Sequence, residues 1–133
     1  MAFTLEHVQQ VRNGRTQQVG VLPDDVWRRL LWTCPWVYLG RSGLTHIAEQ
    51  HPDVTDFDLL HLPMAIARGL IVRLEKSPRK ILAAYKAEHE KIYLCAMKAA
   101  QDSTEIWVDS FYRIKPGKFD NLSRKGTVLR SHK

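Results

Sequence analysis

The chain has 133 residues, of which 44% are hydrophobic and 26% charged, a composition that excludes an intrinsically disordered protein and suits one folded domain. No apolar run approaches the roughly 18 residues needed to cross a bilayer, and the first residues do not resemble a secretion signal, so we expect a cytoplasmic protein without a membrane partner. Cys34 and Cys95 stand far apart in apolar stretches. This pattern predicts buried thiols, not a disulfide framework or a zinc site.

The net charge of +6 is confined to one end of the chain. Residues 111–133 contain seven basic side chains and one acidic side chain, whereas the charges of residues 1–110 cancel. Such one-sided positive charge is typical of a nucleic-acid-binding surface. The alternative interpretation is a solvated and frayed basic tail.

The first half of the chain is predicted to be mostly helical. Residues 15–22 alternate enough for a short strand, and a helix follows Pro23 and its two aspartates. Residues 33–43 are predicted to be a short strand or extended segment that ends in glycines. A helix is expected from about Ser42 to just before Pro52, because the residue before a proline disfavours the helical region. Residues 57–70 predict two short helical pieces, interrupted at Pro63 and closed by a glycine.

The second half has the periodicity of strands. We expect strands within residues 70–75, 79–87, 91–100 and 104–114, and the short links between the last three favour an antiparallel meander. Residues 118–133 predict a helical turn that ends at Gly126, followed by one short strand. The expected fold class is α+β, with N-terminal helices packed on an antiparallel sheet of about four strands, in a single domain over residues 1–133.

The order of these motifs resembles the phage-associated branch of the barnase, EndoU, colicin-type and RelE-like (BECR) nuclease superfamily. The resemblance is carried by "YLGRSGLTHIAEQHPD", "LPMAIARGL" before "IVRLE", "KILAAYKA", "KIYLCAMK", "EIWVDSFYRIK" and "LSRKGTVL". It covers roughly residues 36–130 and leaves a strand–helix extension over residues 1–35. Its helices followed by a four-stranded antiparallel sheet agree with the fold class expected above.

The resemblance implies a metal-independent endoribonuclease that needs no cofactor, of the kind that serves as a toxin or as an RNase of a phage or mobile element. RNA, for example transfer RNA, is then the expected partner, and an immunity protein or antitoxin would restrain the enzyme. The alternative is a catalytically inactive relative that serves as a nucleic-acid-binding or phage-associated protein-interaction module.

RNA cleavage by transesterification needs a base for the 2′-hydroxyl proton, an acid for the leaving 5′-oxygen, and donors that stabilise the phosphorane. His46 and His51 are the natural acid/base candidates, although their spacing places them about 140° apart around a helix. His46 could instead be a partly buried histidine with a satisfied hydrogen bond, and His51 a cation at the helix C-terminus. The sequence "HIAEQH" is not the HExxH zinc motif, so we expect no metal site.

The strand that contains "EIWVDSFYRIK" supplies the other catalytic candidates. Strict alternation places Ser110 and Tyr112 on the same face as Ile106 and Val108, and Arg113 on the opposite face. In the resembled family a serine or threonine at this place is a common active-site position, and the alternative is a hydroxyl bonded to a neighbouring strand. Arg113 is expected either to clamp a phosphate or to form an ion pair with an acidic neighbour.

Further basic and aromatic side chains complete the expected site. Lys91 is expected either to stabilise charge in catalysis or to be a solvated lysine at a strand end, and Tyr112 is expected to stack on a base or bind a phosphate. The remaining substrate-binding candidates are His51, Arg73, Lys115 and Lys118. The four tryptophans are expected in the core because three of them lie in apolar patterns. His61 shows no convergent partner in the sequence.

Overall fold

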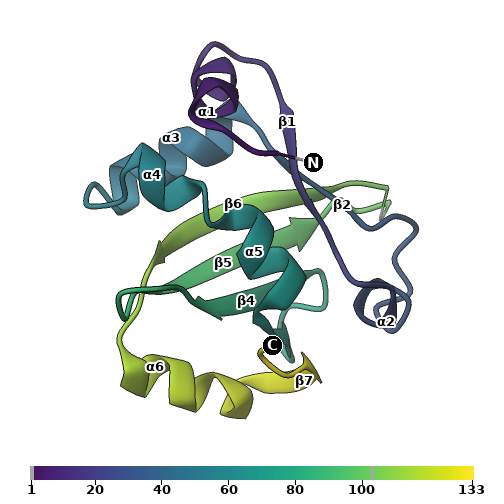
Figure 1. The fold of residues 1–133 in the computed structure, drawn as a ribbon. Helices are drawn as coiled ribbons and strands as arrows, with labels where there is room; N and C mark the ends of the chain where they lie inside the picture. The colour runs from purple at the N-terminus through teal and green to yellow at the C-terminus, as the bar shows by residue number, and fades with distance from the viewer. Residues whose placement is uncertain (1, 103) are drawn as a thin grey trace.

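The computed structural model describes residues 2–102 and 104–133, and these form a mixed sheet with helices against both of its faces (Figure 1). In chain order the elements are α1 (Leu5–Arg12), β1 (Gln17–Val21), α2 (Asp24–Trp27), β2 (Trp36–Leu39), α3 (Arg41–Gln50), α4 (Asp56–Leu59), α5 (Leu62–Arg68), β3 (Leu70–Leu74), β4 (Lys80–Lys86), β5 (Ile92–Ala99), β6 (Ile106–Arg113), α6 (Pro116–Asn121), the 3₁₀ turn η1 (Leu122–Arg124) and β7 (Gly126–Arg130).

The sheet has seven strands in the order β1-β2-β6-β5-β4-β3-β7. The predicted antiparallel sheet of about four strands is therefore wrong. The meander β3-β4-β5-β6 is present, but β2 pairs with β6 in parallel and β7 pairs with β3. Local patterning predicts that a segment forms a strand, but not which strand it pairs with, because pairing depends on residues distant in sequence. Such distant pairings add β1 and β2 at one end of the sheet and β7 at the other.

The two faces of the sheet bury two different groups of apolar side chains. On one face, α3 and α5 pack over the inward residues of β4, β5 and β6, and Figure 1 shows α5 crossing in front of β4 and β5. On the other face, α6 and η1 cover a smaller cluster that contains Val72, Ala84, Leu94 and Leu122. The helices consequently do not all precede the sheet, and α6 leaves part of the second face uncovered.

The predicted helix boundaries are mostly correct. Helix α3 ends at Gln50, before Pro52, as expected from the restriction that proline imposes on its predecessor. The predicted interruption at Pro63 is misplaced, because Pro63 lies in the first turn of α5, where its missing N–H costs nothing. Helix α1 begins at a capping box between Thr4 and His7 and was not predicted.

The basic C-terminal segment is folded. After α6 and η1 it forms β7, which pairs with β3, as the predicted final strand required. Beyond β7, the ring of His132 accepts a hydrogen bond from the amide of Lys86 at 3.0 Å, and the amide of Lys133 donates to the carbonyl of Arg68 at 2.9 Å. The interpretation as a frayed tail is therefore wrong.

The sequence predicted the burial of the cysteines correctly, but that of the tryptophans only in part. Cys34 and Cys95 are both buried, as predicted. Trp32 is buried too, but Trp36 is 48% exposed and Trp107 only half-buried, so the expectation that the tryptophans lie in the core is wrong for these two. Both stand on strands, and their side chains point to the part of the second face that α6 leaves uncovered.

Within the described residues, no helix combines the length and apolar character needed to cross a lipid bilayer.

Candidate functional site at the end of strand β6

Strand β6 contains a bulge that decides where its polar side chains point. Ser110 lies opposite Ala96 on β5, but the next pair upstream joins Val108 to Met97, so Asp109 is an extra residue in the ladder. The bulge breaks the strict alternation that the sequence analysis assumed. Ser110 and Tyr112 lie on the face that α6 covers, whereas Val108 lies on the face of α3 and α5.

This geometry corrects one prediction and confirms another. Ser110 is not a lone hydroxyl among Ile106 and Val108, because the bulge places it on the opposite face from them. Ser110 and Arg113 do lie on opposite faces, as expected for residues three apart beyond the bulge. One pocket on one face of the sheet therefore does not contain both side chains.

Arg113 forms an ion pair with a buried carboxylate. Its Nη2 atom lies 2.9 and 2.8 Å from the two oxygens of Asp58, whose side chain is 2% exposed. The Tyr93 hydroxyl donates to the same carboxylate at 2.6 Å, and the amide and hydroxyl of Thr55 donate at 2.8 and 3.1 Å. Of the two expected roles of Arg113, the structure therefore contains the ion pair.

The hydrogen bonds determine the charge of this carboxylate. Burial alone raises the pKa of Asp58, but the bonds from the Thr55 amide, Tyr93, Arg113 and the Thr55 hydroxyl outweigh burial and lower the pKa to about 2. The pKa of Tyr93 is raised by its own burial and by the adjacent carboxylate. Asp58 is thus ionised at neutral pH and connects α4 to β5 and β6.

A second cluster, on the other side of β6, consists of His51, Tyr112 and Lys118, which we call the His51 stack. The rings of His51 and Tyr112 are nearly parallel, with centroids 4.2 Å apart and planes inclined by 14°. The Nζ atom of Lys118 lies 3.1 Å from the Tyr112 hydroxyl and 4.8 Å from the centre of its ring. The sequence predicted all three as substrate-binding residues, and the fold brings them together.

Two elements hold the His51 stack in place. His51 is the C-terminal cap of α3, and its amide donates to the carbonyl of Ile47 at 2.8 Å. Lys118 lies on α6, which begins directly after β6. Tyr112 therefore has an imidazole and an ammonium group as neighbours, and each of the three groups can donate a hydrogen bond to a phosphate oxygen.

Lys91 and Lys115 lie at the same end of the sheet. The amide of Ile114 donates to the carbonyl of Ile92 at 2.8 Å, so the chain after β6 runs beside the start of β5. Lys91 lines a surface cavity of about 650 Å³ together with Lys86 and Pro116. Exposed cations thus surround the end of the sheet where the basic segment begins.

The remaining predicted residues, His46 and Arg73, are not in this cluster. His46 is exposed on α3, and the described residues give it no hydrogen bond, ion pair or ring contact. Arg73 lies on β3, which β4 and β5 separate from β6, so the two strands are about 14 Å apart. Neither alternative suggested for His46, a buried and bonded histidine or a partner of Ser110, appears among the described contacts.

Sequence reasoning missed the residues around Asp58. The pattern Thr55-Asp56-Phe57-Asp58 is a capping-box signal and could have indicated the start of α4. No sequence signal indicated that the same carboxylate would meet Tyr93 and Arg113, which follow 35 and 55 residues later. His61 also has a partner, because its ring stacks on Tyr93 with centroids 4.9 Å apart.

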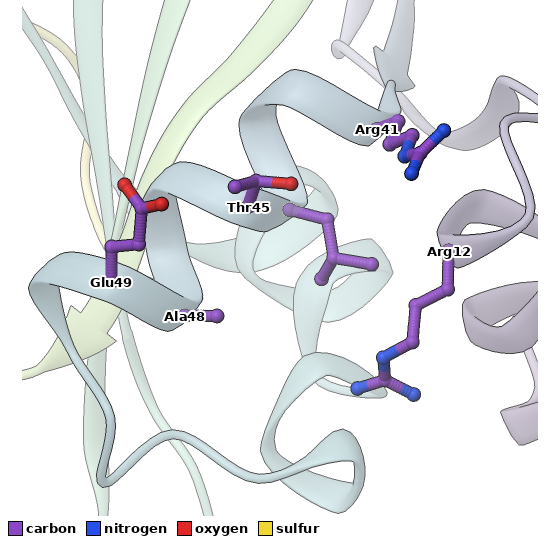
Figure 2. Close-up of a pocket in the computed structure, with 6 residues that line it drawn as sticks. Arg12, Arg41, Thr45, Ala48 and Glu49 are labelled. Atoms are coloured by element: carbon purple, nitrogen blue, oxygen red, sulfur yellow. The ribbon is translucent and has the colours of Figure 1, made fainter.

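A separate hollow of about 320 Å³ lies between α1 and α3, and Figure 2 shows Arg12 and Arg41 projecting toward it from different elements. Arg12 already forms an ion pair with Asp56, which neutralises its charge. Glu49 lines the hollow as well. This surface therefore offers an anion only one uncompensated guanidinium.

Among the described residues, no group of histidine, cysteine, aspartate and glutamate side chains is arranged to hold a metal ion.

No protein-family model matches the chain, and no curated protein or solved structure is detectably similar to it.

Proposed function

We propose that the protein is an endoribonuclease-like domain that cleaves RNA by attack of the 2′-hydroxyl, with the His51 stack at the scissile phosphate. The observation that carries the proposal is the 4.2 Å stacking of His51 on Tyr112 with the Lys118 ammonium 3.1 Å from the phenol oxygen. The cluster stands where the excess positive charge of the chain begins. It combines an imidazole, which can accept a proton, with two hydrogen-bond donors.

Each group has a role that matches its chemistry. His51 accepts the proton of the 2′-hydroxyl, whose oxygen then attacks phosphorus while the bond to the 5′-oxygen breaks. Lys118 stabilises the charge that develops on the phosphorane oxygens, and the Tyr112 hydroxyl donates the proton that the 5′-oxygen needs. Lys91 and Lys115 attract the flanking phosphates. The products are a 2′,3′-cyclic phosphate and a free 5′-hydroxyl.

Arg113 has a positioning role in this proposal. Its guanidinium is bound to Asp58 and contributes to the site by holding the end of β6 against α4. Ser110 lies on the same face as Tyr112, two residues earlier and about 7 Å along the strand, where its hydroxyl can contact the neighbouring nucleotide.

The test is incubation of the purified protein with total transfer RNA in EDTA. Wild type is expected to yield fragments with 2′,3′-cyclic phosphate ends, and His51→Ala and Lys118→Ala are expected to lose activity at least a hundredfold. His46→Ala in parallel decides between the two histidines. Intact RNA at high protein concentration, or equal activity of His51→Ala and wild type, would overturn the proposal.

Nucleic-acid binding without cleavage is the second candidate function. The observation that favours it is the ion pair of Arg113 with Asp58, which leaves the site without a free guanidinium to stabilise a phosphorane. If the protein binds without cleaving, RNA should stay intact in EDTA, and the affinity for RNA should fall steeply as the salt concentration rises. If the domain does cleave, a partner such as an immunity protein or antitoxin would have to restrain it in its own cell.

A further inference from the structure

The strand register places four aromatic and basic side chains in one row across the sheet. Tyr38 on β2 pairs with Trp107 on β6, Trp107 with Lys98 on β5, and Lys98 with Lys80 on β4. Residues directly opposite each other on adjacent strands point to the same face. We call Tyr38, Trp107, Lys98 and Lys80 the cross-strand row, and Trp36 joins its aromatic end because it stands two residues before Tyr38.

The cross-strand row lies on the face that α6 covers only in part. The cluster beneath α6 and η1 contains apolar residues of β3, β4 and β5 together with Tyr112, but no member of the row. Three hollows lie along the row instead. Their volumes are about 440, 280 and 200 Å³, and neighbouring hollows share Trp107 or the pair Arg79 and Lys98. The three hollows thus follow one another along the cross-strand row, and we call them together the groove.

Two of the aromatic rings of this groove contact each other. The Trp107 indole N–H donates to Glu105 at 3.0 Å, and its ring contacts that of Tyr38 with centroids 5.8 Å apart. Trp36 is 48% exposed, so the fold does not gain the stabilisation that full burial of its ring would give. The groove thus presents ring surface that none of the described residues covers.

The basic half of the row contains an uncompensated charge. Lys80 pairs with Asp109 at 3.4 Å, and Arg79 donates to the carbonyl of Ala99 at 3.4 Å. Lys98 makes no hydrogen bond or ion pair within the described residues, yet it stands directly opposite Lys80. Like charges in this arrangement destabilise a sheet, and a bound anion relieves the repulsion.

From these observations we propose that the groove binds single-stranded nucleic acid, with bases stacked on Trp36 and Trp107 and phosphates held by Lys98 and Arg79. Exposed aromatic rings beside cations are the two elements that single-strand binders combine. A duplex does not fit, since its bases are already stacked on one another and do not offer their faces.

This surface is separate from the His51 stack. Trp107 and Tyr112 are near opposite ends of β6, where they face Lys98 and Leu94 on β5, and so lie about 14 Å apart along the strand. The proposal therefore does not rest on cleavage, and it holds for an inactive protein as well. In an active one, the groove would hold the RNA strand that continues from the scissile phosphate.

The experiment measures binding of a fluorescent twelve-nucleotide oligouridine to the full chain by anisotropy, at several salt concentrations and in EDTA. Trp36→Leu is expected to weaken binding about tenfold without changing the salt dependence, because it removes a stacking surface and no charge. Lys98→Gln is expected to lower the slope of log affinity against log salt by about 0.7, the value for one phosphate contact on a single strand. Trp36 and Lys98 are partly exposed, so both variants should fold.

Matched variants elsewhere provide the controls. Phe57→Leu removes an aromatic ring that is 69% exposed on α4, and Arg68→Gln removes an exposed cation on α5, on the opposite face of the sheet. Both variants should leave the affinity, the salt dependence and the quenching of tryptophan fluorescence by the oligonucleotide unchanged. Lys118→Ala separates the two proposals, because it should abolish cleavage while the quenching persists.

Wild-type affinity in both Trp36→Leu and Lys98→Gln would overturn the proposal. Equal binding of a duplex of the same sequence, unaffected by Trp36→Leu, would overturn it too.

Discussion

Asp58 is the residue on which the geometry of the candidate site depends most. It accepts hydrogen bonds from three different side chains and one backbone amide, and these come from the loop before α4 and from β5 and β6. A buried carboxylate is tolerated only when its oxygens are satisfied in this way. Asp58 therefore fixes Arg113 and, through the strand, the position of Tyr112 next to it.

The lowered pKa of Asp58 predicts that acid destabilises the protein. Its pKa is about 2 in the folded chain and about 3.9 when unfolded, so the carboxylate stabilises the fold fully above pH 4 and loses this contribution as the pH falls toward 2. We expect the free energy of unfolding, measured with urea, to fall by about 2 kcal/mol over this range on account of this group alone.

Asp58→Asn should be less stable at pH 7 by a similar amount and should lack this part of the pH dependence. Asp120→Asn, on the exposed surface of α6, is the matched control and should keep the wild-type profile. Parallel pH profiles for wild type and Asp58→Asn would contradict the assignment.

At the scale of elements, the approach of α3 to β6 determines whether His51 reaches Tyr112. A Cβ atom built on Gly43 lies 2.7 Å from the carbonyl oxygen of Val108, which is closer than packed atoms allow. Only glycine lets the helix lie so near the strand. The C-terminal cap of α3 is thereby held beside the end of β6.

Gly43→Ala should consequently move α3 away from β6. We expect a loss of about 1–3 kcal/mol in the free energy of unfolding, as for other overpacked positions, together with weaker RNA cleavage or binding. Gly117→Ala on α6 is the control, since a Cβ there meets nothing within 4 Å, and alanine favours a helix over glycine. If Gly43→Ala were as stable as Gly117→Ala, close packing of α3 would not be required.

The bulge at Asp109 also acts at the scale of a single element, strand β6. One extra residue moves Ser110 to the opposite face while Trp107 stays on the face of the cross-strand row. Strict alternation therefore describes either half of β6 correctly but fails across the bulge. No residue type in "WVDSFY" signals it, since the sequence there contains no glycine.

At the scale of the molecule, the basic C-terminal segment supplies β7, the strand at one edge of the sheet. Leu129 on β7 is 7% exposed and belongs to the main core, and Arg29 on the loop after α2 donates to its carbonyl at 3.0 Å. The segment thus contributes to stability as well as to the net charge. Its cations and its apolar residues make different contributions that mutations can separate.

Deletion of residues 126–133 should abolish cooperative thermal unfolding, measured by circular dichroism, because it uncovers β3 and opens the core. In contrast, replacing the exposed Arg124 and Lys125 by glutamine should change the stability by less than about 0.5 kcal/mol. The same double variant should lower the salt slope of RNA binding by about 1.4, if both cations contact phosphates of a single strand. An unchanged slope would place η1 outside the interface.

The sequence by itself determined most of the local elements and the residue types of the candidate site. Proline and glycine positions predicted the ends of α3 and α5, period-two patterns predicted the meander, and the basic segment pointed to the end of β6, where the His51 stack forms. These features depend on neighbours within a few residues, and such interactions can be inferred from residue types alone.

Only the tertiary structure decided how the strands combine and which groups meet. The parallel pairing of β2 with β6, the bulge at Asp109 and the ion pair of Arg113 with Asp58 join residues that lie tens of positions apart or depend on the ladder between strands. Many such pairings satisfy the same local pattern, and burial of the whole core selects among them. For this reason His51 joined Tyr112 and Lys118 while His46 remained at the surface.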